Sequence, residues 1–187
     1  MLLCTDYEMT AYWLKMPGVE HYFPQTTLAK DGFAHELSIY EQLQEHPHPG
    51  ICEYKGCVVV DGYVQAIALK LHQCDLVEGV EQGLPFDPIG IFNRVEAAVT
   101  HLHSLGLAHN DLNPNNILLD VNYNAVIIDL ETCLPEGCLP ILKYGTPGWS
   151  GNWTHSAFKN DRVALERIQL YLKGKYNPES EQMDPKL

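Results

Sequence analysis

Residues 109–120 read HNDLNPNNILLD, in which one aspartate and four asparagines precede a short apolar run. Asp and Asn are common in turns because their side chains hydrogen-bond to the neighbouring backbone, so the stretch can be a polar turn. The same side chains also bind metal ions and accept protons. The residues on either side decide between a turn and a loop that does chemistry.

A long helix is predicted before this stretch and two short strands after it. Asp87 can cap the helix, with Pro88 at its first position, and Gly106 ends it. Apolar residues recur along the helix at three- and four-residue spacing, at Ile91, Phe92, Val95, Ala98, Val99, Leu102 and Leu105. The segments NILLD at 116–120 and NAVIID at 124–129 predict the strands. The polar stretch therefore joins a helix to a strand.

The loop and the end of the second strand together carry the groups that phosphoryl transfer needs. Residues 109–116 fit the pattern H-x-D-L-x-x-x-N of a kinase catalytic loop, and Asp129 ends the next apolar run. Phosphoryl transfer needs a carboxylate near the attacking hydroxyl and oxygen ligands that hold Mg²⁺ against the phosphates of ATP. Asp111 and Asn116 are the predicted catalytic residues. Asn116 and Asp129 are the predicted metal ligands.

One acidic side chain falls on the apolar face of a helix predicted from Asp31 to the HPHPG stretch at 46–50. The apolar residues of that face are Phe33, Leu37, Tyr40 and Leu43. Glu36 lies among them, where a carboxylate is costly unless a cation pairs with it. Lys15, in a strand predicted over 9–16, is the preferred partner, and its ammonium group could also bind the phosphates of ATP. Lys30 is the alternative cation.

The rest of the chain predicts a hairpin, a connector and a last helix. Asp61-Gly62 separates ICEYKGCVVV from YVQAIALKL, which is a strong signal for two antiparallel strands. Residues 71–85 are predicted to be a connector with one short helical turn, and 135–151 an irregular loop rich in Pro and Gly. A helix is predicted from about residue 160 to 173, followed by Gly174.

Composition excludes several partner classes. The chain has 24 acidic and 12 basic residues and a net charge of −12, which argues against nucleic acid or an anionic membrane surface as a partner. No run of about 18 apolar residues occurs, and Asp6 and Glu8 interrupt the apolar N-terminus, so neither a membrane span nor a secretory signal is expected. The six cysteines contain no C-x-x-C pair and are expected to be free thiols. We therefore expect a cytoplasmic protein.

Residues 9–173 resemble the eukaryotic protein-kinase-like fold, and most closely a compact fungal protein kinase domain. The resemblance is carried by AYWLKMP, HELSIYEQLQEHPHPGI, YKGCVVVDGYVQAIAL, HLHSLGLAHNDLNPNNILL, VIIDLETC, YGTPGWS and NDRVALERI. It implies an α+β, two-lobed fold with a reduced N-terminal β lobe at 1–72 and a truncated, mainly helical C-terminal lobe at 73–187. The catalytic loop and the metal-binding aspartate belong to the second lobe.

The resemblance also implies ligands and roles for individual residues. Adenine is expected at the connector, with Leu69 and Leu71 as cofactor-binding residues beside Lys15 and Glu36. Asp161 is expected to brace the catalytic loop from behind, and residues 145–149 to close the activation segment. The implied cofactors are ATP and Mg²⁺, and the implied partner is a protein substrate.

Four departures from the family pattern bear on activity. No G-x-G-x-x-G occurs, so a reduced cover over the phosphates and weaker ATP binding are expected. Asn110 replaces an arginine that reads activation-loop phosphorylation, and Asn113 replaces a lysine that contacts the transferred phosphate. Glu131 replaces the glycine after Asp129, and several helices of the large lobe are expected to be missing.

The sequence thus predicts an ATP- and Mg²⁺-dependent phosphotransferase that transfers the γ-phosphate to a Ser/Thr hydroxyl of a protein. One alternative is a pseudokinase that binds nucleotide or acts as a scaffold. The other is a small-molecule kinase.

Overall fold

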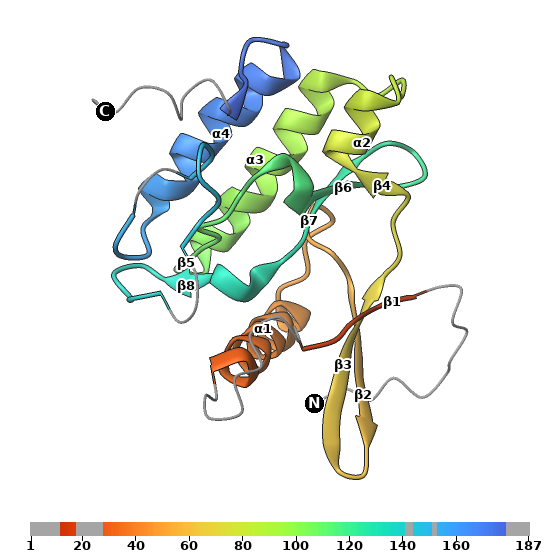
Figure 1. The fold of residues 1–187 in the computed structure, drawn as a ribbon, viewed down its shortest axis with the longest axis vertical. Helices are drawn as coiled ribbons and strands as arrows, with labels where there is room; N and C mark the ends of the chain where they lie inside the picture. Colours follow the sequence, from red (N-terminus) through yellow and green to blue (C-terminus); the bar gives the residue numbers. More distant parts are fainter. Residues whose placement is uncertain (1–11, 18–27, 141–143, 151–152, 179–187) are drawn as a thin grey trace.

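The computed structural model describes residues 12–17, 28–140, 144–150 and 153–178 (Figure 1). A three-stranded sheet and one helix form the lower part of the molecule in this view, and the remaining helices with short strands form the upper part. The α+β class predicted from the sequence is confirmed. A boundary between two domains after residue 72 stays a prediction.

The lower sheet is antiparallel, in the order β1-β3-β2. It consists of β1 (Tyr12–Lys15), β2 (Tyr54–Val60) and β3 (Tyr63–Lys70). Asp61 and Gly62, between β2 and β3, have φ angles of 52° and 81°. A two-residue turn with both φ angles positive matches the twist of the flanking strands, which explains the Asp-Gly pair. The predicted hairpin is confirmed, whereas residues 9–11 of the predicted first strand lie outside the described residues.

Helix α1 (Leu28–Glu45) begins three residues before the predicted start at Asp31. Leu, Ala and Lys at 28–30 are strong helix formers, so the helix extends over them. Its inner face buries Phe33, Ile39, Tyr40 and Leu43. Glu36 lies on the same face with only 1% of its surface exposed, so its carboxylate must be paired inside the protein.

Two capped helices follow the hairpin. The connector contains β4 (Cys74–Asp75) and α2 (Leu76–Glu81), which is slightly longer than the single turn predicted there. The Asp75 carboxylate caps α2 by accepting from Glu78 N. Asp87 accepts from two backbone N–H groups at the start of α3 (Pro88–Ser104), as predicted. Helix α4 (Phe158–Leu172) packs against α3.

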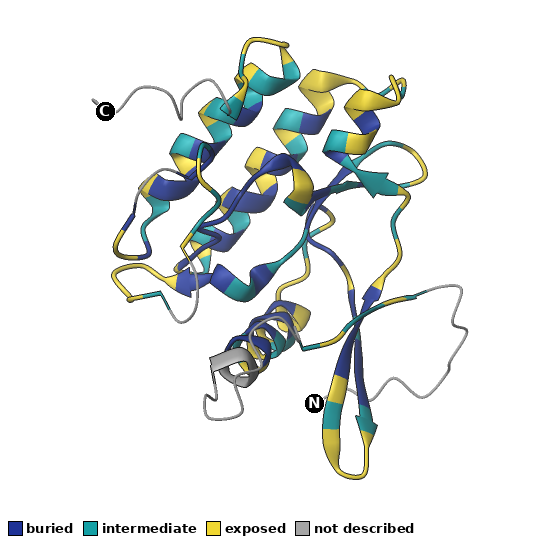
Figure 2. Cartoon of the chain, in the orientation of Figure 1, coloured by how far each residue is buried: buried dark blue, intermediate teal, exposed yellow. Residues whose placement is uncertain are grey.

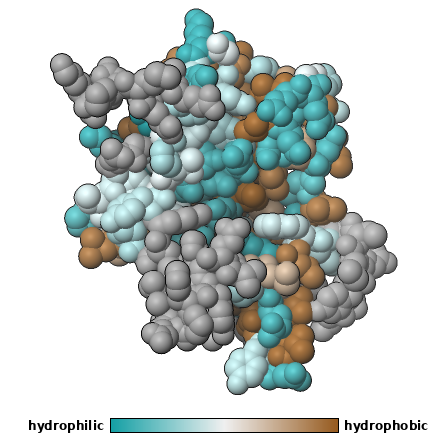
Figure 3. All heavy atoms as spheres, in the orientation of Figure 1, coloured by the Kyte–Doolittle hydropathy of each residue, from teal (hydrophilic) through white to brown (hydrophobic). Residues whose placement is uncertain are grey.

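The core of the upper part lies between these helices and the short strands (Figure 2). Helix α3 contributes Ile91, Val95, Ala98, Val99 and Leu102, and α4 contributes Ala164 and Ile168. These positions recur at three- and four-residue spacing, so each helix presents one continuous apolar face. The lower sheet also leaves hydrophobic residues exposed, among them Trp13 and Val60. Hydrophobic surface is visible over the lower part of the molecule in Figure 3.

Short strands and single turns position the polar loop. The sheet β4-β6-β7 contains β6 (Ile117–Leu119) and β7 (Ala125–Ile127), which confirms the two predicted strands. A second small sheet pairs β5 (Leu107–Ala108) with β8 (Leu134–Pro135). The 3-10 turns η2 (Pro114–Asn116) and η3 (Leu130–Thr132) complete the connections. His109 Nε2 lies 3.0 Å from Ile128 O, and Thr132 Oγ1 donates to His109 O, so the start of the polar loop lies next to residues 128–132.

Residues 47–52 connect the lower part of the molecule to the upper part through hydrogen bonds. Gly50 O accepts from Ile127 N, and Cys52 N donates to Ile127 O. Arg94 on α3 donates to the carbonyl oxygens of Pro49 and Ala125. A Cβ atom at Gly50 would lie 3.0 Å from Ala98 Cβ, so a side chain there would push this stretch away from α3.

The structure also bears on the predicted free cysteines and on the predicted absence of a membrane span. The five cysteines within the described residues, Cys52, Cys57, Cys74, Cys133 and Cys138, are all free thiols. Among the same residues, no helix has the length and apolar content needed to cross a membrane.

Leu102 on α3 is fully buried, so Leu102→Ala should remove core contacts and leave a cavity. We expect the free energy of unfolding to fall by about 2–5 kcal/mol, measured by urea denaturation. Leu170→Ala on the exposed side of α4 is the matched control and should cost less than about 1 kcal/mol. Equal losses in the two variants would contradict the proposed core.

Candidate active site

A buried carboxylate holds the backbone of the polar loop at 109–116. Asp161, in the first turn of α4, is fully buried. Its Oδ2 accepts from His109 N at 2.8 Å, and its Oδ1 accepts from Asn110 N at 2.7 Å. His103 Nε2 on α3 lies 2.8 Å from the same Oδ2 atom. Asp161 therefore braces the loop from α4, in the position that the resemblance implies.

Asn110 connects three segments through its side-chain amide. Its Nδ2 donates to the carbonyl oxygens of Ala108 and Thr132 and to Ser156 Oγ, each at 2.9 Å. Its Oδ1 accepts from Ala157 N and Asn160 Nδ2. Asn110 also has a φ of 65°, a conformation that Asn tolerates better than most residues. From the sequence, this position was notable only because it lacks the arginine of the family pattern. In the structure, the Asn110 side chain is buried and bonds to three segments of the site.

The Asp111 carboxylate faces the segment at 144–150. Its Oδ1 accepts from Thr146 N and from Thr146 Oγ1, both at 2.6 Å, and from Asn113 Nδ2 at 3.2 Å. Only 4% of Asp111 is exposed. The short distance to Thr146 Oγ1 demonstrates that an aliphatic hydroxyl fits at this carboxylate.

Asn113 and Asn116 fix the shape of the loop. Asn113 Oδ1 accepts from the backbone N atoms of Asn115 and Asn116 and so caps η2. Asn116 Nδ2 donates to Asp111 O at 2.8 Å, which leaves its Oδ1 as the atom that can coordinate a cation. The Asn113 side chain thus stabilises the conformation of the loop. Its comparison with a lysine of the family pattern did not indicate this role.

Three charged side chains meet where β7 ends. Lys15 Nζ lies 2.7 Å from a carboxylate oxygen of Glu36 and 2.7 Å from Asp129 Oδ1. Glu36 Oε1 also accepts from Leu130 N at 3.1 Å. The structure thus brings Lys15, from the first strand, to Glu36 on α1 and to Asp129 after β7. Lys30, the alternative partner, has no described side chain.

Asp129 adopts a backbone conformation that is rare for a residue other than glycine. Its φ and ψ are 61° and 72°, in the left-handed region. Such a conformation costs of order 1–3 kcal/mol and persists only where surrounding contacts enforce it. Here the ion pair with Lys15 and the bond from Leu130 N to Glu36 hold the residue on both sides. The carboxylate therefore keeps a fixed direction.

The charges of this cluster do not cancel. Burial lowers the pKa of the Lys15 ammonium, but Glu36 and Asp129 raise it by more, so the pKa lies above its usual value. Burial raises the pKa of the Glu36 carboxyl, and the nearby Asp129 adds to this, although Lys15 acts in the opposite direction. One cation between two carboxylates leaves a net charge of −1, which favours the approach of a further cation.

The residues present fit Mg²⁺. Asp129 and the Oδ1 atom of Asn116 offer oxygen ligands, which this ion prefers. Ile128 N donates to Asn116 O at 3.0 Å, so the backbone holds the loop beside the residue that precedes Asp129. The excess negative charge of the Lys15 cluster also favours a divalent cation near Asp129.

The two predicted adenine contacts have different surroundings. Leu69 lies in β3, pairs with Trp13 of β1 and is almost fully buried in the core. Leu71 follows the end of β3 and is 50% exposed. Their binding of adenine stays a prediction.

Contacts around η3 include residues that the sequence did not single out. Thr132 Oγ1 donates to His109 O at 2.8 Å. His35 Nε2 on α1 lies 2.7 Å from Cys133 O. Both bonds attach the segment after Asp129 to its neighbours, one to the polar loop at 109–116 and one to α1. No local pattern in the sequence could indicate these partners, because each bond joins residues far apart in the chain.

Comparisons with known proteins converge on kinases. Residues 89–136 match the sequence profile of the lipopolysaccharide kinase (Kdo/WaaP) family. The chain is 34% identical over 120 residues to the dual serine/threonine and tyrosine protein kinase of Gallus gallus, which is 60% of this chain and 13% of that protein. It is 28% identical over 169 residues to the probable serine/threonine-protein kinase FMP48 of Saccharomyces cerevisiae, which is 79% of this chain and 46% of that protein.

A third relative is the serine/threonine-protein kinase ppk34 of Schizosaccharomyces pombe, 29% identical over 102 residues. That match covers 49% of this chain and 29% of the relative. The chain therefore spans less than half the length of each of these three relatives.

Asn110→Ala should strongly destabilise the protein, because it removes five side-chain hydrogen bonds and places Ala in a left-handed conformation. We expect a loss of at least about 3 kcal/mol in the free energy of unfolding, measured by chemical denaturation. Asn115→Ala, in the same loop but exposed, is the matched control and should change stability by less than about 0.5 kcal/mol. A small effect at Asn110 would show that the buried amide network is not important for stability.

Proposed function

Because this chain belongs to the protein-kinase-like superfamily, we propose that it is an ATP-dependent phosphotransferase with a Ser/Thr hydroxyl of a protein as acceptor. The observation that carries the proposal is the ion cluster of Lys15, Glu36 and Asp129 beside the loop with Asp111. These residues come from three distant parts of the sequence. Their convergence supports a site for the phosphates of ATP.

Each residue has a separate role in this proposal. Lys15 binds the phosphates of ATP, and Glu36 holds the Lys15 ammonium in place through their ion pair. Asp129 and Asn116 hold Mg²⁺, which neutralises negative charge on the phosphates when bound. Leu69 and Leu71 border the adenine. Asn113 carries no charge, so it does not provide a cation for the transferred phosphate. Lys15, whose Nζ lies 2.7 Å from Asp129 Oδ1, provides the positive charge in this proposal.

Asp111 acts on the acceptor. It accepts the proton of the attacking hydroxyl while the oxygen forms a bond to the γ-phosphorus and the bond to the β-phosphate oxygen breaks. ADP leaves, and the proton remains on Asp111 until solvent takes it. The hydroxyl of Thr146, 2.6 Å from Asp111 Oδ1, supports an acceptor of the Ser/Thr type, since it is the same chemical group. The relatives named as serine/threonine kinases support the same acceptor.

A second candidate is transfer to a sugar or another small-molecule hydroxyl. The lipopolysaccharide kinase profile covers residues 89–136, which contain the catalytic loop, Asn116 and Asp129. A pseudokinase is a further alternative, because Thr146 N and Thr146 Oγ1 already engage the Asp111 carboxylate. An acceptor hydroxyl must then compete with Thr146.

Asp111→Ala should abolish phosphate transfer and leave the binding of Mg²⁺-ATP largely unchanged, because Asp111 acts on the acceptor. Asp129→Asn should weaken both, because it removes charge from the metal site. Transfer is measured with radiolabelled ATP on a generic protein substrate and on a panel of sugars. Binding is measured as the rise in melting temperature with Mg²⁺-ATP.

Asp61→Asn, at the exposed hairpin turn, is the matched control and should leave transfer and binding unchanged. Labelling of sugars without labelling of protein would replace the first candidate by the second. Nucleotide binding with no transfer to any acceptor would favour the pseudokinase. If the protein bound no nucleotide and transferred no phosphate, the proposal as a whole would be contradicted.

Lys15→Met should remove most of the stabilisation by Mg²⁺-ATP, because Met has similar length but no charge for the phosphates. It should also lower the melting temperature of the free protein, since Glu36 then stays buried without its cation. Lys55→Met on β2 is the matched control, because Lys55 pairs with Glu53 at the surface. If Lys15→Met retained the full thermal shift with Mg²⁺-ATP, Lys15 would not bind the phosphates.

A further inference from the structure

The segment that follows α4 lies against residues 146–149. The Tyr176 hydroxyl donates to Gly148 O. The Tyr176 ring lies edge-on to the ring of Trp149, with the two centroids 5.2 Å apart. A Cβ atom at Gly148 would lie 2.8 Å from Pro178 Cβ, so a side chain there would push the two segments apart. The two segments therefore fit closely against each other.

Arg167, on α4, contacts the same residues. Its Nη1 donates to Trp149 O at 2.8 Å, and its Cζ lies 5.9 Å from the centroid of the Tyr176 ring. Tyr171, also on α4, packs edge-on against the buried Trp149 with ring centroids 5.6 Å apart. Edge-on aromatic pairs and a cation near an aromatic ring are both attractive arrangements. Trp149 therefore has a fixed position relative to α4.

A tight turn connects Trp149 to Thr146. Trp149 N donates to Thr146 O at 3.1 Å, which closes the turn. Pro147 and Gly148 are its central residues, and Gly148 has a φ of 83°. Proline followed by a glycine with positive φ is typical of a type II turn, in which proline restricts the backbone. The position of Trp149 therefore determines where Thr146 lies.

Thr146 in turn holds the carboxylate of Asp111. Thr146 N and Thr146 Oγ1 both donate to Asp111 Oδ1 at 2.6 Å, and Asn113 Nδ2 donates to the same atom at 3.2 Å. Three donors on one carboxylate oxygen restrict the rotation of the group. A continuous series of contacts thus leads from Tyr176 to the carboxylate that acts on the acceptor in the proposed reaction.

We propose that Tyr176 and Arg167 are positioning residues for phosphate transfer. They hold the turn at 146–149 in place, and Thr146 then keeps the Asp111 carboxylate directed toward the acceptor hydroxyl. A misplacement of about 1 Å can lower a rate by about 100-fold, so a loosened turn should slow the transfer. The effect on transfer rests on the proposed function, whereas the coupling between Tyr176 and Thr146 does not.

The coupling is tested by amide hydrogen exchange, measured by NMR on the full chain. Tyr176→Phe removes the bond to Gly148 O but keeps the ring. Exchange of the Thr146 and Trp149 amides should accelerate about fivefold, the factor expected for the loss of one hydrogen bond. An unchanged rate at Thr146 would overturn the proposal.

Two other amides separate this local effect from a general loss of stability. The backbone N–H groups of His109 and Asn110 are bonded to Asp161 and not to the turn, so their exchange should not change in Tyr176→Phe. Acceleration there by the same factor as at Thr146 would overturn the proposal.

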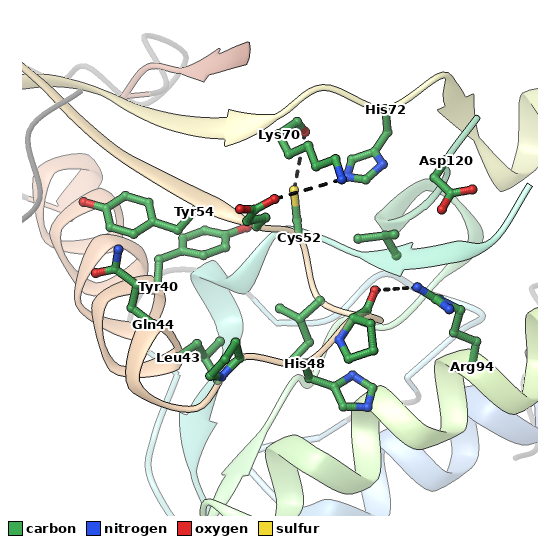
Figure 4. Close-up of a pocket in the computed structure, with 15 residues that line it drawn as sticks. Tyr40, Leu43, Gln44, His48, Cys52, Tyr54, Lys70, His72, Arg94 and Asp120 are labelled. Atoms are coloured by element: carbon green, nitrogen blue, oxygen red, sulfur yellow. Dashed lines mark hydrogen bonds and ion pairs between the residues drawn. The ribbon is translucent and has the colours of Figure 1, made fainter. Parts of the chain in front are cut away.

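Tyr40→Phe is the matched control, because it also removes one tyrosine hydroxyl. Tyr40 and Tyr54 line a cavity of about 540 Å³ that residues 146–149 do not border (Figure 4). The Tyr40 hydroxyl has no hydrogen-bond partner among the described residues. This variant should therefore leave the exchange of the Thr146 amide unchanged.

Transfer is measured with the acceptor that the unmodified protein labels from radioactive ATP, well below the melting temperature of every variant. Each rate is divided by the concentration of sites that bind a non-hydrolysable ATP analogue with Mg²⁺, so that unfolded protein does not count. Tyr176→Phe and Arg167→Ala should each lower kcat about three- to tenfold and leave the dissociation constant of the analogue unchanged. Arg167→Lys should lose less, because an ammonium can still donate to Trp149 O. Arg162→Ala, at an exposed position of α4, is the matched control and should keep the normal kcat.

The outcomes separate the positioning role from the proposed function. A loss of rate that disappears after correction for binding sites would leave Tyr176 and Arg167 a structural role only and overturn the proposal. Faster transfer by the variants would also overturn it, because Thr146 would then obstruct Asp111. Accelerated exchange in a protein that transfers no phosphate would retain the coupling and reject the proposed function. Unchanged transfer despite accelerated exchange would retain the proposed function and reject the positioning role.

Discussion

The ion cluster around Lys15 is the interaction on which the rest of the structure depends. Its ammonium lies 2.7 Å from carboxylate oxygens of both Glu36 and Asp129. Glu36 is buried, so α1 can keep its present position only while a cation neutralises that side chain. Asp129 is held in a left-handed conformation by the same contact. A single lysine thus aligns β1, α1 and the end of β7.

A second constraint acts on the polar loop at 109–116 and involves a different aspartate. Asp161 is fully buried and uses both oxygens to accept from backbone N–H groups of the loop, while Asn110 links the loop to the segments at 132 and 156–160. Asp111 instead presents its carboxylate toward the hydroxyl of Thr146. The two aspartates therefore differ in purpose because of their neighbours. Asp161 fixes the loop, whereas Asp111 bonds to the backbone and the hydroxyl of Thr146 in the neighbouring segment.

Local signals in the sequence were sufficient for most elements and for one long-range pair. Caps, the Asp-Gly turn and periodic apolar residues predicted the two long helices, the hairpin and the strands around 121–124. A carboxylate on an apolar helix face requires a cation, and the position of Lys15 on a predicted strand favours it over Lys30 as that cation. The role of Asn110, the bond from Thr146 to Asp111 and the β5-β8 pair could not be predicted. Each depends on residues that only the folded chain brings together, and asparagine in a loop has the same local signature whether it is buried or exposed.

Helix α1 places two buried polar side chains on the same face through the spacing of its residues. Glu36 and Tyr40 are four residues apart, so they lie on the same face, one turn from each other. Glu36 is bonded to Lys15 and to Leu130 N, whereas the Tyr40 hydroxyl has no partner among the described residues. Both side chains are only 1% exposed, so they are held by the close packing of the interior around this face of α1. Because the contacts of Glu36 are short, charged and buried, a small displacement of α1 has a large energetic consequence at Lys15.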